Sequence, residues 1–170
     1  MYIKADSTRR MYVPFAKLPA SARLWIYQAN RPFTTAEVEA LQPALQHFAA
    51  DWTSHGRALA ASAAVFHHRF LVIGLDEAVA DASGCSIDAS VRFVRQVEEQ
   101  FGIELLDKSR LAFLLQDEIQ LLDRRELKQA VSSGMLLPGT PYFDNTIGTQ
   151  AQLQTGWPAP AASTWLARYF

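Results

Sequence analysis

Apolar and polar residues alternate in several short stretches of the chain, and each of these stretches predicts a β-strand. In the stretch 23–28, Leu24 and Ile26 fall on one face, while Trp25 and Tyr27 fall on the other. Alternation or a short apolar run also predicts strands at 59–66, 69–75, 111–115 and 119–122. Polar residues separate these strands, so hairpin turns are expected at His67–His68 and at 116–118.

A spacing of three and four residues predicts an amphipathic helix over 38–54. Thr34 and Glu37 form a capping-box pattern in front of it, because each side chain can bond a backbone amide that the first turn leaves without a partner. Pro43 lacks an amide hydrogen and is expected to kink or divide the helix. Gly56 is expected to end it.

The helical spacing returns over 87–101 and predicts a second amphipathic helix. Ser86 is the expected N-cap, since its hydroxyl can accept from a first-turn amide. Gly102 suits the left-handed position that follows many helices. A third, short helix is expected after Asp123, which forms another capping-box pattern with Glu126.

The resulting order is strand, helix, strand, strand, helix, strand, which is the ferredoxin-like split βαβ (βαββαβ) pattern of an α+β protein. Right-handed crossovers then place both helices on one face of an antiparallel sheet with strand order 4-1-3-2. The other face would carry Trp25 and Tyr27, and we expect the aromatic tail 157–170 to cover them. The chain is expected to form one domain, made of an irregular lead-in (1–21), an α+β core (22–134) and a C-terminal extension packed on it (135–170).

The charge balance bears on the choice of partners. The 170 residues include 16 Lys and Arg against 17 Asp and Glu, a formal net charge of −1. Nucleic-acid binders usually carry a basic excess that engages phosphates, so we expect no nucleic acid as partner. The longest apolar run, 70–75, is far shorter than the ~20 residues of a membrane span, and 1–19 lack the pattern of a signal peptide. A cytoplasmic protein with no membrane partner is therefore expected.

Cys85 is the only cysteine of the chain. A single cysteine excludes an intrachain disulfide and any multi-cysteine metal site. His67 and His68 are neighbours at a strand end and point to opposite faces, so they are poorly placed to chelate one ion. We expect no metal and no cofactor.

The expected topology brings the loop after the first helix and the loop before the second helix to the same end of the sheet. His55 lies in the first loop and Cys85 in the second. A helix N-terminus favours a thiolate, a nearby histidine can act as base, and free amides can stabilise developing charge. A cysteine-dependent enzyme for acyl or thiol transfer is therefore one hypothesis. The simpler alternative is that Cys85 belongs only to a helix start and that His55 packs on the apolar side of the first helix.

Five further residues are candidates for ligand binding. Ser83, Ser86 and Arg57 lie in the two loops that carry Cys85 and His55, whereas Asn30 and Arg31 lie at the opposite end of the sheet. The guanidinium of Arg31 has the geometry to bind a carboxylate or phosphate. The alternatives are that Ser86 only caps its helix and that Arg31 forms a structural ion pair.

Four stretches of the chain resemble a family of small bacterial proteins that has no established activity. They are "RLWIYQANRPFTTAEV", "DWTSHG", "ASGCSIDASVRF" and "GWPAPAASTW". The resemblance covers most of 22–170, and members of the family are often labelled "ABC transporter ATPase". That label implies a P-loop, G-x-x-x-x-G-K-S/T, but no lysine of this chain follows a glycine. The residues do not support the label.

Taken together, the sequence favours a binding or regulatory module that recognises a small molecule or a protein. Sheets of this kind often associate through a face or an edge, so a homodimer is among the expected partners. The alternative function is the cysteine-dependent enzyme that uses Cys85 and His55.

Overall fold

The computed structural model describes residues 11–170, which form two compact units. Unit 1 contains the residues up to Leu106 together with Gly148–Gln150, and unit 2 contains Asp107–Ile147 and Ala151–Phe170. Each unit buries its own apolar cluster. The protein is α+β, as expected. The expected core of 22–134 spans parts of both units instead of forming one of them.

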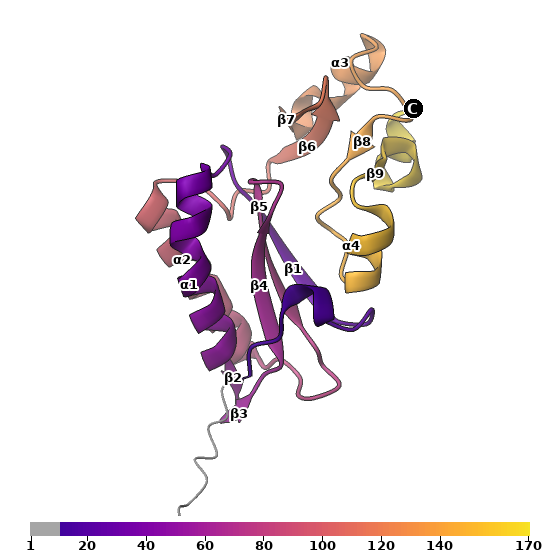
Figure 1. The fold of residues 1–170 in the computed structure, drawn as a ribbon. Coiled ribbons are helices and arrows are strands. Elements are labelled where there is room, and N and C mark those ends of the chain that lie inside the picture. The colour runs from indigo at the N-terminus through magenta and orange to yellow at the C-terminus, as the bar shows by residue number, and fades with distance from the viewer. Residues whose placement is uncertain (1–10) are drawn as a thin grey trace, which may run out of the picture. The chain divides into compact units, whose positions relative to one another are not determined.

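Unit 1 is built on a three-stranded antiparallel sheet with the order β1-β5-β4 (Figure 1). Its strands are β1 (Arg23–Gln28), β4 (Ala61–Phe66) and β5 (Phe70–Leu75). His67 and His68 form the turn of the β4–β5 hairpin, both with φ of 52°. Two left-handed residues in a row are typical of a type I′ turn, whose twist matches that of the strands. These strands occupy the order expected for the first three strands of the pattern.

Two long helices, α1 (Thr35–Asp51) and α2 (Gly84–Phe101), lie on the same face of this sheet (Figure 1). The capping box that opens α1 is confirmed, because Thr34 Oγ1 accepts from the Glu37 amide and the Glu37 carboxylate accepts from the Thr34 amide. The helix runs through Pro43 without a break and ends earlier than expected, at Asp51. A short hairpin, β2 (Thr53–Ser54) and β3 (Arg57–Ala58), follows it.

The faces of β1 are the reverse of those expected. Trp25 and Tyr27 pack in the cluster beneath the helices, where Trp25 makes an edge contact with Trp52, the residue that directly follows α1 (ring centroids 5.8 Å apart). Burial raises the pKa of the Tyr27 hydroxyl, which is hydrogen-bonded to Ser90 of α2. The prediction that the C-terminal tail covers Trp25 and Tyr27 is therefore wrong. Both faces of β1 are apolar, so alternation alone does not tell which face meets the helices.

The lead-in covers part of the opposite face. Its short 3₁₀ helix η1 (Phe15–Lys17) brings Phe15 and Leu18 against the sheet. Phe15 also makes an edge contact with Phe66 of β4, at 5.0 Å between centroids. Gly74 of β5 permits this close approach, since an added Cβ would lie 2.5 Å from Leu18 Cδ1.

The ferredoxin-like expectation differs from the structure at the fourth strand. The stretch expected to pair with β1 belongs instead to a second sheet in unit 2. The edge of β1 that faces away from β5 is bordered by Gly148–Gln150. The Leu24 amide donates to the Gly148 carbonyl, and the Gln150 amide donates to the Ala22 carbonyl, both at 2.9 Å. A short segment from late in the chain thus lies where the pattern places a full strand.

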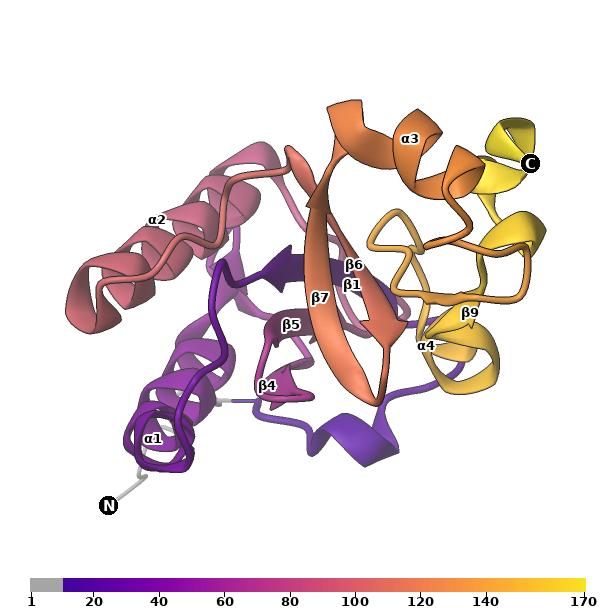
Figure 2. The same ribbon diagram turned by 90° about the horizontal axis from the view of Figure 1, so that it is seen from above.

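Unit 2 holds the second antiparallel sheet, with the order β7-β6-β8-β9 (Figure 2). Its strands are β6 (Arg110–Leu115), β7 (Glu118–Asp123), β8 (Pro141–Tyr142) and β9 (Ala159–Pro160). The β6–β7 hairpin is confirmed, with a two-residue turn at Gln116 and Asp117 whose φ values are 52° and 63°.

The remaining helices are short. Asp123 and Glu126 form the expected capping box, which opens η2 (Arg124–Glu126), and α3 (Leu127–Ser132) follows directly. The C-terminal tail then folds within unit 2, where Trp165 donates to the Tyr142 hydroxyl at 3.2 Å and packs on the core of that unit. The other elements are α4 (Gln150–Gly156), η3 (Ala161–Ser163) and η4 (Trp165–Tyr169).

Candidate functional site

Unit 1 contains a groove of about 710 Å³ between the second half of α1 and the first turns of α2. One wall comes from α1 and the β2–β3 hairpin, and the other comes from α2. The lining residues are Ala44, His47, Phe48, Asp51, Trp52, Thr53, His55, Ser83, Cys85, Ser86, Ala89, Arg92, Phe93 and Gln96.

Three aromatic side chains give the groove its apolar lining. Phe48 of α1 and Trp52, which directly follows the helix, are four residues apart and therefore lie on the same side. Phe93 faces them from α2. The rings of Phe48 and Phe93 stack with centroids 4.4 Å apart and planes within 7°. Trp52 packs edge-on against Trp25 of β1 and donates its indole Nε1 hydrogen to the Ser86 carbonyl at 2.8 Å. The two helices are thus tied together at the groove.

The start of α2 differs from the expectation, because Ser83 and not Ser86 is the N-cap. Ser83 Oγ accepts from the Ser86 amide at 3.2 Å, and Ser86 Oγ accepts from the Ser83 amide at 2.7 Å. The Ile87 amide bonds the Ser83 carbonyl. Of the first-turn amides, those of Gly84 and Cys85 have no acceptor in residues 11–170. Two hydroxyls proposed as ligand donors are therefore engaged with each other.

Cys85 lies in the first turn of α2 with its side chain exposed. Starting the helix three residues earlier than expected moves the thiol from the loop into the helix itself. His55 approaches from the other wall, in the turn of the β2–β3 hairpin. It has φ of 50° and Gly56 has φ of 76°, so Gly56 serves a hairpin turn and does not end α1.

The structure therefore brings Cys85 and His55 to the same groove, as the topology predicted. No hydrogen bond joins the two side chains in the described part of the chain. His55 is exposed, so its expected alternative role as a packed histidine on the apolar side of α1 is wrong.

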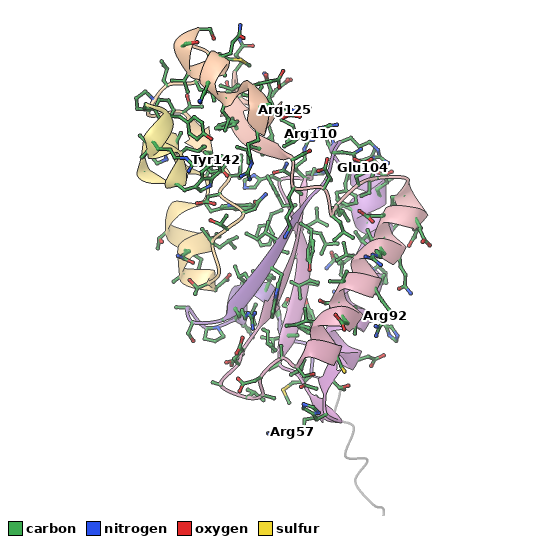
Figure 3. All side chains as sticks on the ribbon, turned by 180° about the vertical axis from the view of Figure 1, so that it is seen from behind. Arg57, Arg92, Glu104, Arg110, Arg125 and Tyr142 are labelled. Atoms are coloured by element: carbon green, nitrogen blue, oxygen red, sulfur yellow. The ribbon has the colours of Figure 1, made fainter. Side chains whose placement is uncertain are left out.

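The ionisable residues of the groove are unevenly paired. His47 and Asp51, one turn apart on α1, approach to 3.1 Å between Nε2 and Oδ2. Arg92 extends from α2 on the side away from the sheet (Figure 3) and has no carboxylate partner among residues 11–170. Among the described residues that line the groove, Arg92 is thus a cation that is available to an anionic group.

Asn30 and Arg31 lie elsewhere and are occupied. Arg31 forms a two-point contact with the Glu37 carboxylate, at 2.9 and 3.0 Å, and also donates to the Phe101 carbonyl at 2.7 Å. The hydrogen bonds from Arg31 lower the pKa of Glu37 to about 2. Asn30 exchanges hydrogen bonds with the backbone of Glu104. Both residues tie the start of α1 to the end of α2, in agreement with the structural alternative for Arg31.

Arg57 is exposed and is not among the residues that line the groove (Figure 3). Its Nη2 donates to the Val79 carbonyl at 3.4 Å. Of the seven candidate residues, four line the groove. They are Cys85, His55, Ser83 and Ser86.

Sequence reasoning missed Phe93, Arg92, His47 and Gln96 as parts of a site. The helical spacing of Phe48 and Trp52 was visible, but it predicted only core. Arg92 stands close to other charged residues of α2, and nothing in the sequence says which side of this helix borders a groove.

Within residues 11–170, no three His, Cys, Asp or Glu side chains gather closely enough to hold a metal ion. Among the same residues, no helix has the length and apolar composition needed to cross a bilayer. No protein-family model, curated protein or solved structure matches the chain.

Proposed function

We propose that this protein is a binding or regulatory module and that the groove between α1 and α2 holds a flat, largely apolar small molecule with an acidic group. The observation that carries the proposal is the combination, in one groove, of an aromatic wall with an arginine that has no carboxylate partner among residues 11–170. Ligand pockets are typically ~300–1,000 Å³, mostly apolar, with a few polar groups that orient the ligand. The groove volume of about 710 Å³ lies within that range.

The aromatic lining favours a ring system in the ligand. Phe48 and Phe93 already stack on each other, and Trp52 borders them. Aromatic side chains offer large apolar contact area, and pairs of rings gain further from offset or edge-to-face geometry. A planar ligand can extend this cluster without a polar group of the protein being left buried and unpaired.

Arg92 favours an acidic group at one end of that ligand. Its guanidinium lacks a carboxylate partner in the described chain, and arginine binds carboxylates through two parallel hydrogen bonds. His47 Nε2 lies 3.1 Å from the Asp51 carboxylate, so Asp51 already has a partner on its own helix. Binding of an acid here adds a charge-assisted contact without breaking an existing ion pair.

The test compares an aromatic acid with its neutral counterpart. We expect 2-naphthoate to bind more tightly than 2-naphthylmethanol, measured by calorimetric titration of the full chain. Arg92→Gln should lower the affinity for 2-naphthoate by roughly tenfold and leave that for the alcohol unchanged. Arg95→Gln removes an exposed charge from the same helix, outside the groove lining, and should change neither. Equal binding of the acid by the wild type and Arg92→Gln would contradict the proposal.

A second candidate function is supported by the exposed thiol in the same groove. In the cysteine-dependent enzyme, Cys85 is the nucleophile, His55 takes its proton, and the free amides of Gly84 and Cys85 stabilise developing charge. The test is the pH dependence of Cys85 alkylation by iodoacetamide. A thiol titrating clearly below ~8.5, and shifting upward in His55→Ala, is the expected result for a coupled pair. Identical profiles in both proteins would exclude the coupling.

We also propose that the chain belongs to the small bacterial family that its four sequence stretches resemble, without the ATPase activity of the label. Unit 1 is best described as a shortened ferredoxin-like arrangement. The strand order β1-β5-β4 and the position of α1 and α2 on one face support this description. Because Trp25 and Tyr27 lie under the helices, they offer no stacking surface for RNA. We expect a cytoplasmic protein without a nucleic-acid partner.

A further inference from the structure

We infer that the open edge of β7 in unit 2 pairs with the β7 edge of a second copy of this chain, in antiparallel orientation and in one register. Both edge strands of the unit 1 sheet, by contrast, have a neighbouring segment of the chain. β1 is bordered by Gly148–Gln150, and β4 is bordered at Ala61 by the lead-in, whose Val13 amide donates to the Ala61 carbonyl. β7 stands at the end of its sheet next to β6 (Figure 2) and has no second neighbour in the described chain.

The hairpin geometry shows which backbone groups of β7 face outward. In a two-residue hairpin the residues flanking the turn, here Leu115 and Glu118, exchange hydrogen bonds. The Arg124 amide bonds the Ser109 carbonyl, six residues further along the same ladder. Even-numbered residues of β7 therefore face β6, and the amides and carbonyls of Ile119 and Leu121 face away from it. No partner for these groups exists within residues 11–170.

The edge lacks the features that usually prevent pairing. Natural edge strands are often short or carry a lysine, a proline or a bulge at their centre. β7 has six residues, and its central residues Ile119 and Leu121 are apolar and half-buried. Neither is among the residues of the unit 2 apolar cluster. By contrast, β9 at the other end of the sheet has only two residues.

Charge selects the register of the pair. In a two-fold dimer, the backbone amides and carbonyls of β7 that face away from β6 bond the same groups of the partner. One register that allows this places Leu121 opposite the partner's Leu121. This register also puts Glu118 opposite the partner's Arg124. These two residues form a pair without backbone hydrogen bonds, in which opposed side chains approach most closely. Sliding by one pair instead puts Asp117 opposite the partner's Asp123, which is repulsive.

The two members of the expected ion pair are available for it. Glu118 and Arg124 are exposed, and neither has a carboxylate or guanidinium partner in the described chain. Arg124 is held with its guanidinium over the Trp165 ring, 5.2 Å from the centroid, which limits its freedom before association. In the dimer, the Leu121 amide donates to the carbonyl of the partner's Leu121, and the partner returns the same bond.

The first test measures sedimentation of the full chain over a wide range of concentrations. We expect a monomer–dimer equilibrium that Leu121→Pro weakens by roughly ten- to hundredfold, the loss of two backbone hydrogen bonds per dimer. Proline is tolerated on an edge strand where its nitrogen faces outward, so β7 should stay paired with β6. A wild type that remains monomeric at every concentration overturns the inference.

The second test concerns the register and does not depend on how the proline variant folds. Glu118→Arg should weaken the dimer several-fold, and adding Arg124→Glu should restore it, because the swap recreates both ion pairs. Glu99→Arg makes the same charge change at an exposed position of α2 and should leave the monomer–dimer equilibrium unchanged. With rising concentration, hydrogen exchange should slow at the Ile119 and Leu121 amides. A dimer that none of these substitutions affects uses another surface and overturns the inference.

Discussion

Replacement of Trp52 by phenylalanine tests whether this residue joins the two walls of the groove. Trp52 is 3% exposed, its indole Nε1 donates to the Ser86 carbonyl at 2.8 Å, and its ring contacts Trp25 and Phe48. Phenylalanine keeps an aromatic ring at the position but removes the hydrogen bond and part of the buried ring. Both losses fall at the contact between α1 and the first turn of α2.

The expected cost follows from these two losses. Removing one partner of a buried hydrogen bond costs ~1–3 kcal/mol. The smaller ring adds about 1 kcal/mol, since large-to-small substitutions in a core lose contact and leave a gap. We expect a total of about 2–4 kcal/mol. For a chain of this size a loss of 1 kcal/mol lowers Tm by ~2–4 °C, so Tm should fall by roughly 4–16 °C.

The assay is thermal unfolding followed by circular dichroism, combined with the titration by 2-naphthoate. Trp165→Phe is the matched control, because it removes an indole hydrogen bond in unit 2 and should leave ligand binding unchanged. Trp52→Phe should weaken ligand binding as well as lower Tm. An unchanged Tm, or lost binding in the control variant, would refute the reasoning that Trp52 sets the groove.

Three other substitutions or conditions test the fold. Gly74→Ala should destabilise by ~1–3 kcal/mol in denaturant unfolding, because its Cβ would meet Leu18 Cδ1 at 2.5 Å, whereas Gly84→Ala meets nothing within 4 Å and should not destabilise. The pKa of Glu37 is lowered to about 2 by the Arg31 hydrogen bonds, so this contact stabilises the fold above the ordinary pKa of 4.5. That stabilisation is lost as the pH falls toward 2. In denaturant unfolding, the free energy of unfolding should therefore decrease less between pH 5 and pH 2 in Arg31→Gln than in the wild type. Deletion of 157–170 should expose the unit 2 core and promote association, and a monomeric truncation with unchanged Tm would disagree.

Sequence patterns predicted local structure well where one short-range interaction decides it. The capping boxes at Thr34 and Asp123 are formed as expected, and Gly102 is left-handed with φ of 60°. Each depends on residues within a few positions of one another. The N-cap of α2 was placed three residues late, because Ser83 and Ser86 both have suitable hydroxyls and only the fold distinguishes the cap from its partner.

Contacts between residues far apart in the sequence were harder to predict. Both faces of β1 are apolar, so the sequence did not indicate that Trp25 and Tyr27 meet the helices. The strand at 111–115 was correct as a strand, but its hairpin partner and Tyr142 hold it in unit 2. The site followed the same rule: Cys85 and His55 share a groove because their loops share an end, while the contribution of Arg92 depended on helix packing.

The most direct test of the proposed binding site is the mapping of amide and indole chemical shifts by NMR while 2-naphthoate is added to the full chain. We predict that the perturbed signals cluster at the groove, with the Trp52 indole and the amides near Cys85 and Phe93 changing most. Signals of unit 2, including the Trp165 indole, should stay in place. Perturbations confined to unit 2, or none at saturating ligand, would contradict the account.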